Sequence, residues 1–211
     1  MELLLTDRLS CPRCGPAFGL ILLANHMAAR RVQDGQLGCP NCRDAFPIRE
    51  GFADLRAPPR GPLQDGLAGL GLDAPERVDE AERAIALLGV ARGPGTVALV
   101  GAPARFATRL VARVDHLQAV AVDADARAWP EHEGVSRIVA SPGLPFFSRT
   151  LRGVVVDGRL GSGVLFEAAR VTAPMSRVVV VDAPEDSTSV LEEGGLHILA
   201  EEAETVVAAR G

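Results

Sequence analysis

The sequence predicts an α/β protein that begins with a small zinc ribbon and continues as a doubly wound, mostly parallel sheet of seven strands. Three observations lead to this prediction. Two Cys-x-x-Cys pairs lie near the N-terminus, and beyond Gly95 a short apolar segment recurs about every twenty residues. The last two apolar segments are separated only by Glu201–Glu204, which is too short for a crossover helix and predicts an antiparallel hairpin.

The four cysteines form two matched pairs, Cys11-Pro12-Arg13-Cys14 and Cys39-Pro40-Asn41-Cys42. Each tight Cys-x-x-Cys turn directs two thiolates at one point, and a hairpin between the turns brings the pairs together around a tetrahedral zinc ion. Disulfides or free thiols are the alternatives, but a disulfide requires an oxidising compartment and gives no reason for two matched turns. We therefore expect Cys11, Cys14, Cys39 and Cys42 to bind zinc.

Composition changes mark the expected domain boundaries. Residues 57–73 are rich in Pro, Gly and small side chains and show no sustained period, as is typical of a linker. The segment Asp73-Ala74-Pro75-Glu76 then has the signals of a helix start, and Gly89 is a plausible stop. We expect a ribbon over residues 1–56, a linker over 57–74 and an α/β domain over 75–211.

The apolar segments of the α/β domain are continuous runs, which indicates strands that are buried on both faces of a sheet. They are Thr96–Val100, Leu117–Val122, Arg137–Ala140, Gly153–Val156 and Arg177–Val181, with Leu196–Ala200 and Thr205–Ala209 as the final pair. Helical patterns lie between several of them, around Ala104–Val114 and Gly163–Thr172. This alternation predicts a doubly wound fold.

Charge and hydropathy narrow the range of partners. Residues 1–56 carry seven arginines against six acids, whereas the rest of the chain carries fifteen against twenty-one. An acidic main domain attracts a phosphate backbone poorly, so we do not expect a dedicated nucleic-acid surface. No apolar run approaches the roughly 20 residues of a membrane span, and the first residues lack a signal-peptide pattern. We expect no membrane association and a cytoplasmic location.

The end of the ribbon has a specific pattern, Phe46-Pro47-Ile48 followed by Gly51-Phe52. Together with the Cys-Pro-x-Cys turns, it resembles the small zinc-ribbon proteins that activate tRNA and protein methyltransferases. It is also similar to the ribbon that precedes some bacterial methyltransferases. The resemblance covers about residues 9–55. It implies that an apolar face of the ribbon, including Phe46, Ile48 and Phe52, docks on a methyltransferase domain.

The α/β domain resembles the class I S-adenosylmethionine (SAM) methyltransferases over about residues 75–210. Val120-Ala121-Val122-Asp123 is similar to their second strand with its ribose-binding acid. Gly143-Leu144-Pro145-Phe146 resembles a Leu-Pro-Phe loop of small-molecule methyltransferases, and Glu167-Ala168-Ala169-Arg170-Val171 resembles the segment that leads into their fifth strand. The resemblance implies that SAM is a possible cofactor.

The loop after the first strand departs from that family's pattern. The family carries an acid two residues before a Gly-x-Gly-x-Gly loop, whose backbone amides approach the methionine part of SAM. The corresponding run here is Leu99-Val100-Gly101-Ala102-Pro103-Ala104-Arg105. Gly101 is retained, but Leu99 replaces the acid, and Pro103 and Arg105 replace the other two glycines. We therefore interpret the loop as degenerate.

Gly101 and Asp123 are the candidate cofactor-binding residues under this resemblance. A solvated aspartate at the end of a strand would give the same sequence pattern. Asp123 is therefore either a ribose ligand or a solvated residue at a strand end, and both interpretations stay open. Asp157 is a candidate base, although Asp-Gly after a strand is commonly a turn. The histidines form no recognisable pairing, and Trp129 is expected to be a packing residue. No catalytic residue is assigned.

The sequence leaves two functional hypotheses. The first is a zinc-binding, methyltransferase-like protein with a degenerate SAM loop that acts as a non-catalytic subunit or regulator. The second is an active SAM-dependent methyltransferase for a small molecule. The ribbon can reach its own α/β domain or another protein, and we expect it to contact its own domain.

Overall fold

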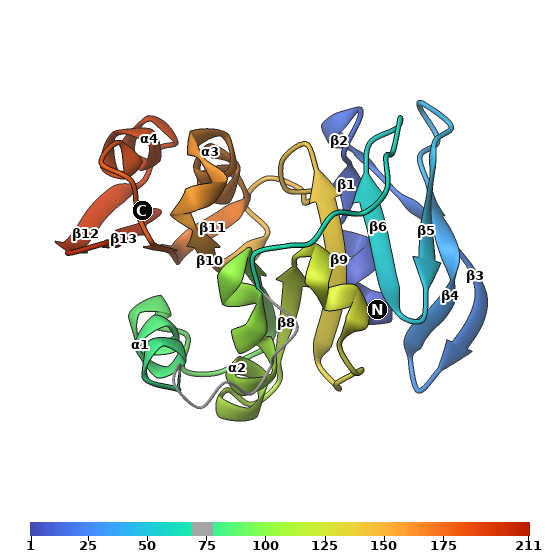
Figure 1. The fold of residues 1–211 in the computed structure, drawn as a ribbon, viewed down its shortest axis with the longest axis horizontal. Helices are drawn as coiled ribbons and strands as arrows, with labels where there is room; N and C mark the ends of the chain where they lie inside the picture. The colour runs from blue at the N-terminus through green and yellow to red at the C-terminus, as the bar shows by residue number, and fades with distance from the viewer. Residues whose placement is uncertain (69–77) are drawn as a thin grey trace.

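The computed structural model describes residues 1–68 and 78–211 (Figure 1). We call residues 1–56 the ribbon and residues 78–211 the α/β part. The ribbon begins with a 3-10 helix and continues in short strands that are mostly joined by tight turns. Its elements are η1 (Leu3–Arg8), β1 (Ser10–Cys11), β2 (Gly15–Gly19), β3 (Ile21–Ala28), β4 (Arg31–Gly38), β5 (Ala45–Arg49) and β6 (Phe52–Arg56).

The α/β part contributes seven strands with helices on both faces. The strands are β7 (Gly95–Val100), β8 (Leu117–Val122), β9 (Val135–Ser141), β10 (Leu151–Asp157), β11 (Thr172–Val181), β12 (His197–Glu202) and β13 (Thr205–Ala209). The helices are α1 (Val78–Leu88), α2 (Ala107–Arg113), α3 (Ser162–Val171) and α4 (Ser187–Glu193), with 3-10 turns η3 (Ala102–Phe106), η4 (Ala124–Ala128) and η5 (Gly158–Leu160).

Each predicted strand of the α/β part is present, and the terminal pair forms the expected antiparallel hairpin. Strands β9, β8, β7, β10 and β11 run parallel in that order, and β13 joins β11 antiparallel. The predicted start of the first helix at Asp73–Glu76 lies outside the described residues. Helix α4 was not predicted, because it is short and buries only Ser187 and Leu191.

The sheet is larger than the predicted seven strands. In the described part of the chain, four ribbon strands continue it into one mixed 11-stranded sheet with the order β12-β13-β11-β10-β7-β8-β9-β6-β5-β4-β3. Strand β6 joins β9 in parallel, with the register running from Phe52 opposite Arg137 to Arg56 opposite Ser141. The prediction that the ribbon contacts its own α/β part is therefore confirmed (Figure 1). The boundaries at residues 56 and 75 stay a prediction.

A second line of backbone contacts ties the start of the ribbon to the loop after β9. The Ser10 N–H donates to the Pro145 carbonyl at 2.9 Å, and the Phe147 N–H donates to the Arg8 carbonyl at 3.0 Å. Between them, Leu9 forms an isolated antiparallel bridge with Phe146. The ribbon therefore pairs with the α/β part along both the β9 edge and this loop.

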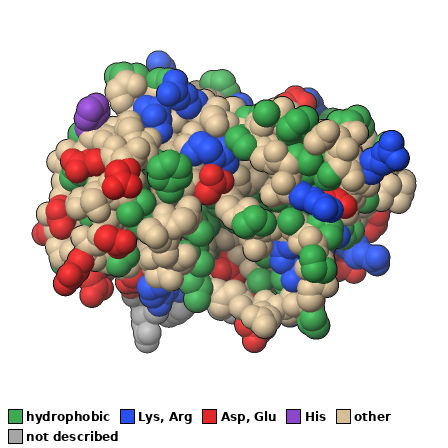
Figure 2. All heavy atoms as spheres, turned by 90° about the horizontal axis from the view of Figure 1, so that it is seen from above, with side chains coloured by type: hydrophobic (Ala, Val, Ile, Leu, Met, Phe, Trp, Pro, Cys, Tyr) green, Lys and Arg blue, Asp and Glu red, His purple; other side chains and the backbone are tan. Residues whose placement is uncertain are grey.

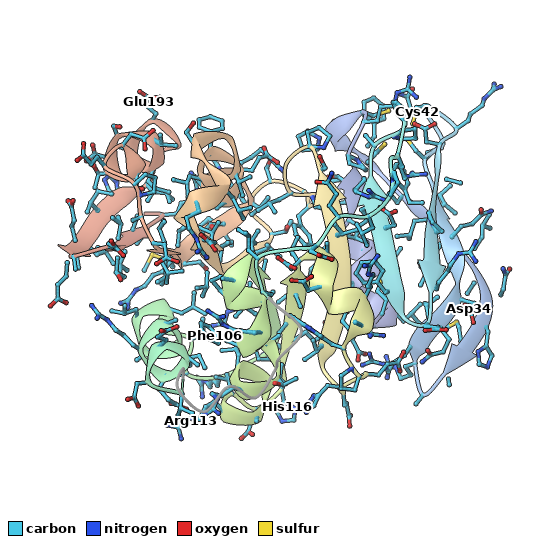
Figure 3. The ribbon with its side chains drawn as sticks, viewed as in Figure 1. Asp34, Cys42, Phe106, Arg113, His116 and Glu193 are labelled. Atoms are coloured by element: carbon cyan, nitrogen blue, oxygen red, sulfur yellow. The ribbon has the colours of Figure 1, made fainter. Side chains whose placement is uncertain are left out.

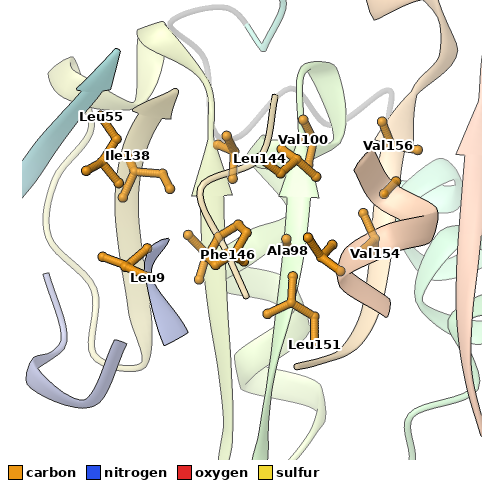
Figure 4. Close-up of a cluster of buried hydrophobic side chains, with 14 of the residues drawn as sticks. Leu9, Leu55, Ala98, Val100, Ile138, Leu144, Phe146, Leu151, Val154 and Val156 are labelled. Carbon is orange, nitrogen blue, oxygen red and sulfur yellow. The ribbon is translucent and has the colours of Figure 1, made fainter. Parts of the chain in front are cut away.

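One hydrophobic core spans the ribbon and the α/β part on the sheet face that carries α3 and α4. Leu9 and Leu55 of the ribbon lie in the same cluster as Ile138 and Phe146 (Figure 4). All four side chains are fully buried. A second cluster fills the opposite face beneath α1 and α2. Burial of shared apolar surface is therefore a major stabilising contribution to ribbon docking.

A buried arginine, Arg137, makes polar contacts between the ribbon and the α/β part. The Arg137 guanidinium is 5% exposed and donates hydrogen bonds to the carbonyls of Trp129 in the α/β part and Glu50 in the ribbon. It also lies 3.6 Å from a Glu131 carboxylate oxygen. Burial lowers the pKa of Arg137, and the charge of Glu131 opposes that change. A charge in this position requires its partners, because it has lost most of its hydration.

We predict that Arg137→Met lowers the free energy of unfolding by about 2–4 kcal/mol, because it leaves buried acceptors of both parts unsatisfied. Arg83→Met is the control: Arg83 pairs with Glu202, and both side chains are largely exposed, so its effect should stay below about 1 kcal/mol. Chemical denaturation measures both. Equal effects of the two substitutions would contradict the assigned role of Arg137.

Candidate functional site

The four cysteines come together at one end of the ribbon. The first pair begins at Cys11, the last residue of β1, and the second follows β4. Cys42 lies at the end where β6 and β9 finish, far from Asp34 (Figure 3). All four Sγ atoms lie within 4.8 Å of one another. Sγ separations are 3.7 Å for Cys11 and Cys42 and 3.8 Å for Cys14 and Cys39.

These separations decide between the alternatives for the cysteines. Four thiolates at about 2.3 Å from a tetrahedral zinc ion lie about 3.8 Å apart. A disulfide would bring two sulfurs to about 2.05 Å, and all four cysteines are free. N–H groups also donate to sulfur: the Cys14 backbone nitrogen lies 3.4 Å from the Cys11 Sγ, and the Asn41 side-chain Nδ2 lies 3.3 Å from the Cys14 Sγ. The four cysteines are positioned to bind a metal, and the geometry fits zinc.

An ion pair spans the two cysteine turns. Arg13, in the first turn, donates to Asp44, just after the second turn, at 3.0 Å. This hydrogen bond holds the pKa of Asp44 below its usual value. The pair therefore fastens the two turns together from outside the cysteine cluster.

The loop after β7 is closed by an aspartate from β10. Gly101 has φ of 73°, and a Cβ at this position would lie 2.8 Å from the Asp157 Cβ. Glycine is therefore required by both the backbone angle and the close approach. The Asp157 carboxylate accepts the Ala102 N–H at 3.3 Å and thereby occupies the space in front of the loop.

Asp157 itself is fully buried and paired with Arg159. It accepts the Arg159 backbone N–H at 3.0 Å, the Nε at 2.9 Å and an Nη at 2.6 Å. Burial opposes its ionisation, but the hydrogen bonds and charge of Arg159 outweigh burial and lower the pKa of this carboxyl. A carboxylate held in this way is a weak proton acceptor, which disfavours Asp157 as a base.

Asp123 lies at the end of β8 and is 7% exposed. One carboxylate oxygen accepts the Asp125 N–H at 2.9 Å, and the other accepts the N–H of Leu67 at 2.9 Å. Burial raises the pKa of Asp123, and these N–H groups oppose the rise. Leu67 belongs to the segment that the sequence identified only as linker, so Asp123 already has a partner from its own chain.

Gly101 and Asp123 line one cavity of about 350 Å³, and their role in cofactor binding stays a prediction. It opens at the end of the sheet viewed from above in Figure 2, where the surface is hollowed near its centre. Gly143 and Leu144 separate it from a second cavity of about 460 Å³, which lies between the first cysteine turn and α3. The end of the sheet therefore carries two adjoining cavities, one of which the ribbon helps to build.

The loop between β9 and β10 is held by an ion pair on α3. Glu167 accepts the Leu144 N–H at 3.0 Å, and Arg170 donates to the carbonyls of Leu144 and Phe146 at 2.9 and 2.8 Å. Glu167 and Arg170 are joined by two hydrogen bonds of 2.7 Å. These two residues act on loop structure, and their i, i+3 spacing is the signal that sequence reasoning could have used.

Trp129 does not line either of the two cavities. Trp129 is 5% exposed and lies in the second hydrophobic cluster, as expected of a packing residue. No helix in the described residues is long and apolar enough to cross a membrane.

Comparison with known proteins finds a family match in the ribbon and structural matches to a larger part of the chain. Residues 2–51 match the family model of Trm112p-like proteins. No curated protein matches the sequence. Among solved structures, a chain from the complex between the Haloferax volcanii Trm112 methyltransferase activator and a methyltransferase is similar, with a TM-score of 0.51 and 18% identity over 67% of this chain and 80% of that chain.

Two further solved structures are more distant. A protein described as an SAM-dependent methyltransferase from Methanococcus maripaludis has a TM-score of 0.48 and 14% identity over 66% of this chain and 87% of its own. Geranyl diphosphate methyltransferase in complex with SAM has a TM-score of 0.47 and 12% identity over 58% of this chain and 66% of its own. The N-terminal residues of this chain are therefore similar to Trm112p-like proteins, and its fold is methyltransferase-like.

We predict that the purified protein carries about one zinc ion per chain and that Cys39→Ser weakens zinc binding by at least about 100-fold. Amides of β4 and β5 should then lose hydrogen-exchange protection, while those of β7 and β10 keep it. Arg43→Ser, next to Cys42, is the control and should retain the metal. Metal analysis that finds no zinc, with thiols paired as disulfides, would rule out the assignment.

A second prediction concerns Asp157. Asp157→Asn should lower stability at neutral pH by about 1–3 kcal/mol, because it breaks a buried charged hydrogen-bond set. A lowered pKa means that this contribution is present above the unfolded value of about 3.9 and is lost as the pH falls through the folded value. The difference from the unsubstituted protein should therefore shrink in acid. Asp182→Asn removes a weaker, half-exposed partner of Arg159 at 3.4 Å and should have an effect below about 1 kcal/mol. Equal losses at pH 7 and pH 3 would contradict the pairing.

Proposed function

We propose that this protein is a non-catalytic member of the methyltransferase-like fold, with its activator-like zinc ribbon docked on its own α/β part, and that it acts as a subunit or regulator. The observation that supports this most strongly is the state of the loop after β7. The N–H groups of Gly101, Ala102 and Ala104 are all hydrogen-bonded within the fold, so they are not available to the methionine part of SAM.

The backbone N–H groups of residues 101–104 can be accounted for one by one. The Gly101 N–H donates to the Val122 carbonyl at 3.0 Å, and the Ala104 N–H donates to the Gly101 carbonyl at 2.9 Å. The Ala102 N–H donates to Asp157, and Pro103 has no N–H. Ala102, Pro103 and Ala104 are also buried. The methionine end of SAM therefore does not fit the residues present, although the acid that would meet the ribose is retained.

The pairing of the ribbon is a second observation that supports the same proposal. A Trm112 activator forms a complex with a separate methyltransferase in the similar structure. Here the last ribbon strand is already paired with β9 of the same chain. We infer that the module stabilises its own α/β part and that any partner protein binds elsewhere on the molecule. Zinc would serve this arrangement by holding the two cysteine turns together.

An active methyltransferase for a small molecule remains the second candidate, and one observation favours it. Gly101 and Asp123 share a cavity of about 350 Å³ that adjoins a second cavity of about 460 Å³. Both volumes lie in the range of small-molecule sites. In this alternative, the first cavity would hold part of the cofactor and the second would hold the methyl acceptor. The cytoplasmic location stays a prediction under either function.

We predict that the unsubstituted protein shows no saturable SAM binding at micromolar concentrations. The double substitution Pro103→Gly and Arg105→Gly should raise SAM affinity by about tenfold or more, because it removes a rigid ring and a long side chain from the loop and restores one N–H. Adding Asp123→Asn to that double variant should remove the gain. Calorimetry measures all three, and micromolar SAM binding by the unsubstituted protein, with methyl transfer, would favour the second candidate instead.

A further inference from the structure

We propose that residues 65–68 form a built-in strap that occupies the nucleoside end of the cavity at Asp123, so that a nucleoside binds there only after the strap has left. This inference concerns the carboxylate end of the cavity and does not depend on the state of the loop after β7. It therefore goes beyond the proposed function.

Backbone N–H groups of the strap donate hydrogen bonds to the carboxylates of Asp123 and Asp125. The Leu67 N–H donates to the Asp123 Oδ2 at 2.9 Å, and the Gly66 N–H donates to the Asp125 Oδ1 at 2.9 Å. The other Asp123 oxygen is taken by the Asp125 N–H. A ribose would present two hydroxyl donors to this carboxylate, and a backbone N–H now stands in for one of them.

The approach of the strap is also too close to leave room for a ligand. A Cβ on Gly66 would lie 1.7 Å from one Asp123 carboxylate oxygen, 2.7 Å from the other and 2.5 Å from the Cγ. The backbone of Gly66 therefore passes directly over the carboxylate. Asp65, Gly66 and Leu67 all line the cavity. A hydroxyl group and this backbone cannot occupy the same place.

The first residues of the linker are hydrogen-bonded to the docked ribbon and to the end of β9. The Ala57 N–H donates to the Ser141 carbonyl at the end of β9 at 2.7 Å. Arg56 donates to the Gly61 carbonyl at 3.1 Å, and Arg60 donates to the Ala45 carbonyl at 3.0 Å. The Arg60 guanidinium also lies 4.9 Å from the centre of the Phe46 ring. These contacts fix where the linker leaves the ribbon, so ribbon docking sets the position of the strap.

The strap is held in a way that permits release. The Leu67 side chain is 42% exposed, and the Asp65 side chain is 94% exposed. The strap therefore buries little apolar surface at these two positions, whereas Ala68 is 3% exposed and lies in the second hydrophobic cluster, and the Asp123 contact is made by backbone hydrogen bonding. A ligand that offers equivalent donors can compete with it. By linkage, a nucleoside that binds must loosen the strap, and a looser strap must raise nucleoside affinity by the same factor.

Glycine provides a matched pair of variants for the test. Gly66→Ala places a methyl group against the Asp123 carboxylate, whereas a Cβ at Gly61, in the same linker, meets nothing within 4 Å. Neither glycine has a positive φ, so alanine is compatible with the backbone at both positions. Leu67→Pro provides a second route, because it removes the N–H that Asp123 accepts.

The experiment titrates the full zinc-loaded chain with adenosine, which has ribose hydroxyls but no amino-acid part, and follows the exchange of the amides of residues 66–68. We expect Gly66→Ala and Leu67→Pro to speed that exchange and to raise adenosine affinity at least tenfold, with Gly61→Ala unchanged. Adenosine should also speed the exchange in the unsubstituted protein.

The proposal is overturned if Gly66→Ala and Leu67→Pro release the strap without a gain in adenosine affinity, including the case in which no variant binds adenosine at millimolar concentrations. It is also overturned if the strap stays protected in Gly66→Ala or in the adenosine complex. SAM binding by the unsubstituted protein would contradict the proposed function. It would agree with the strap proposal if SAM also sped the exchange of the strap amides, and it would contradict the strap proposal if those amides stayed protected.

Discussion

The parallel pairing of β6 with β9 is the constraint on which the rest of this structure depends. Without it, β9 would be an open edge strand, and Leu55 and Ile138 would lose the shared core in which both are fully buried. Edge strands invite pairing with other chains, and here the chain supplies the pairing strand itself. The zinc-binding turns and the shared core therefore serve a common end, which is to keep the ribbon in register on β9.

Ribbon docking also shapes the end of the sheet where a cofactor would bind. The ribbon holds the loop after β9 through the backbones of Arg8 and Ser10, while α3 holds the same loop through Arg170. The linker then leaves β6 and reaches Asp123 through Leu67. The cavity at Asp123 is therefore lined by the linker and the α/β part, and the ribbon lines the adjoining cavity. The ribbon in this position contributes to the shape of this end of the sheet as well as to the shared core.

Local pattern predicted most of the secondary structure and the cysteine cluster. Two Cys-x-x-Cys turns and buried strands with continuous apolar runs are properties of neighbouring residues, so the sequence contains them directly. The contacts that decide function are made between distant residues. Leu67 and Asp123 are 56 positions apart, and Ala102 and Asp157 are 55 apart. No local period signals such a pair, so the partner of Asp123 and the contact of Asp157 with the loop after β7 became visible only in the fold.

The measurement that tests the account most directly is residue-resolved hydrogen exchange of the intact protein before and after removal of its zinc by a chelator. The account predicts that β9 amides are protected with zinc bound and exchange faster once the ribbon loses its metal, while β10 and β11 keep their protection. Equal protection of β9 in both states, with the ribbon amides alone released, would show that ribbon docking does not hold this edge of the sheet and would contradict the central claim.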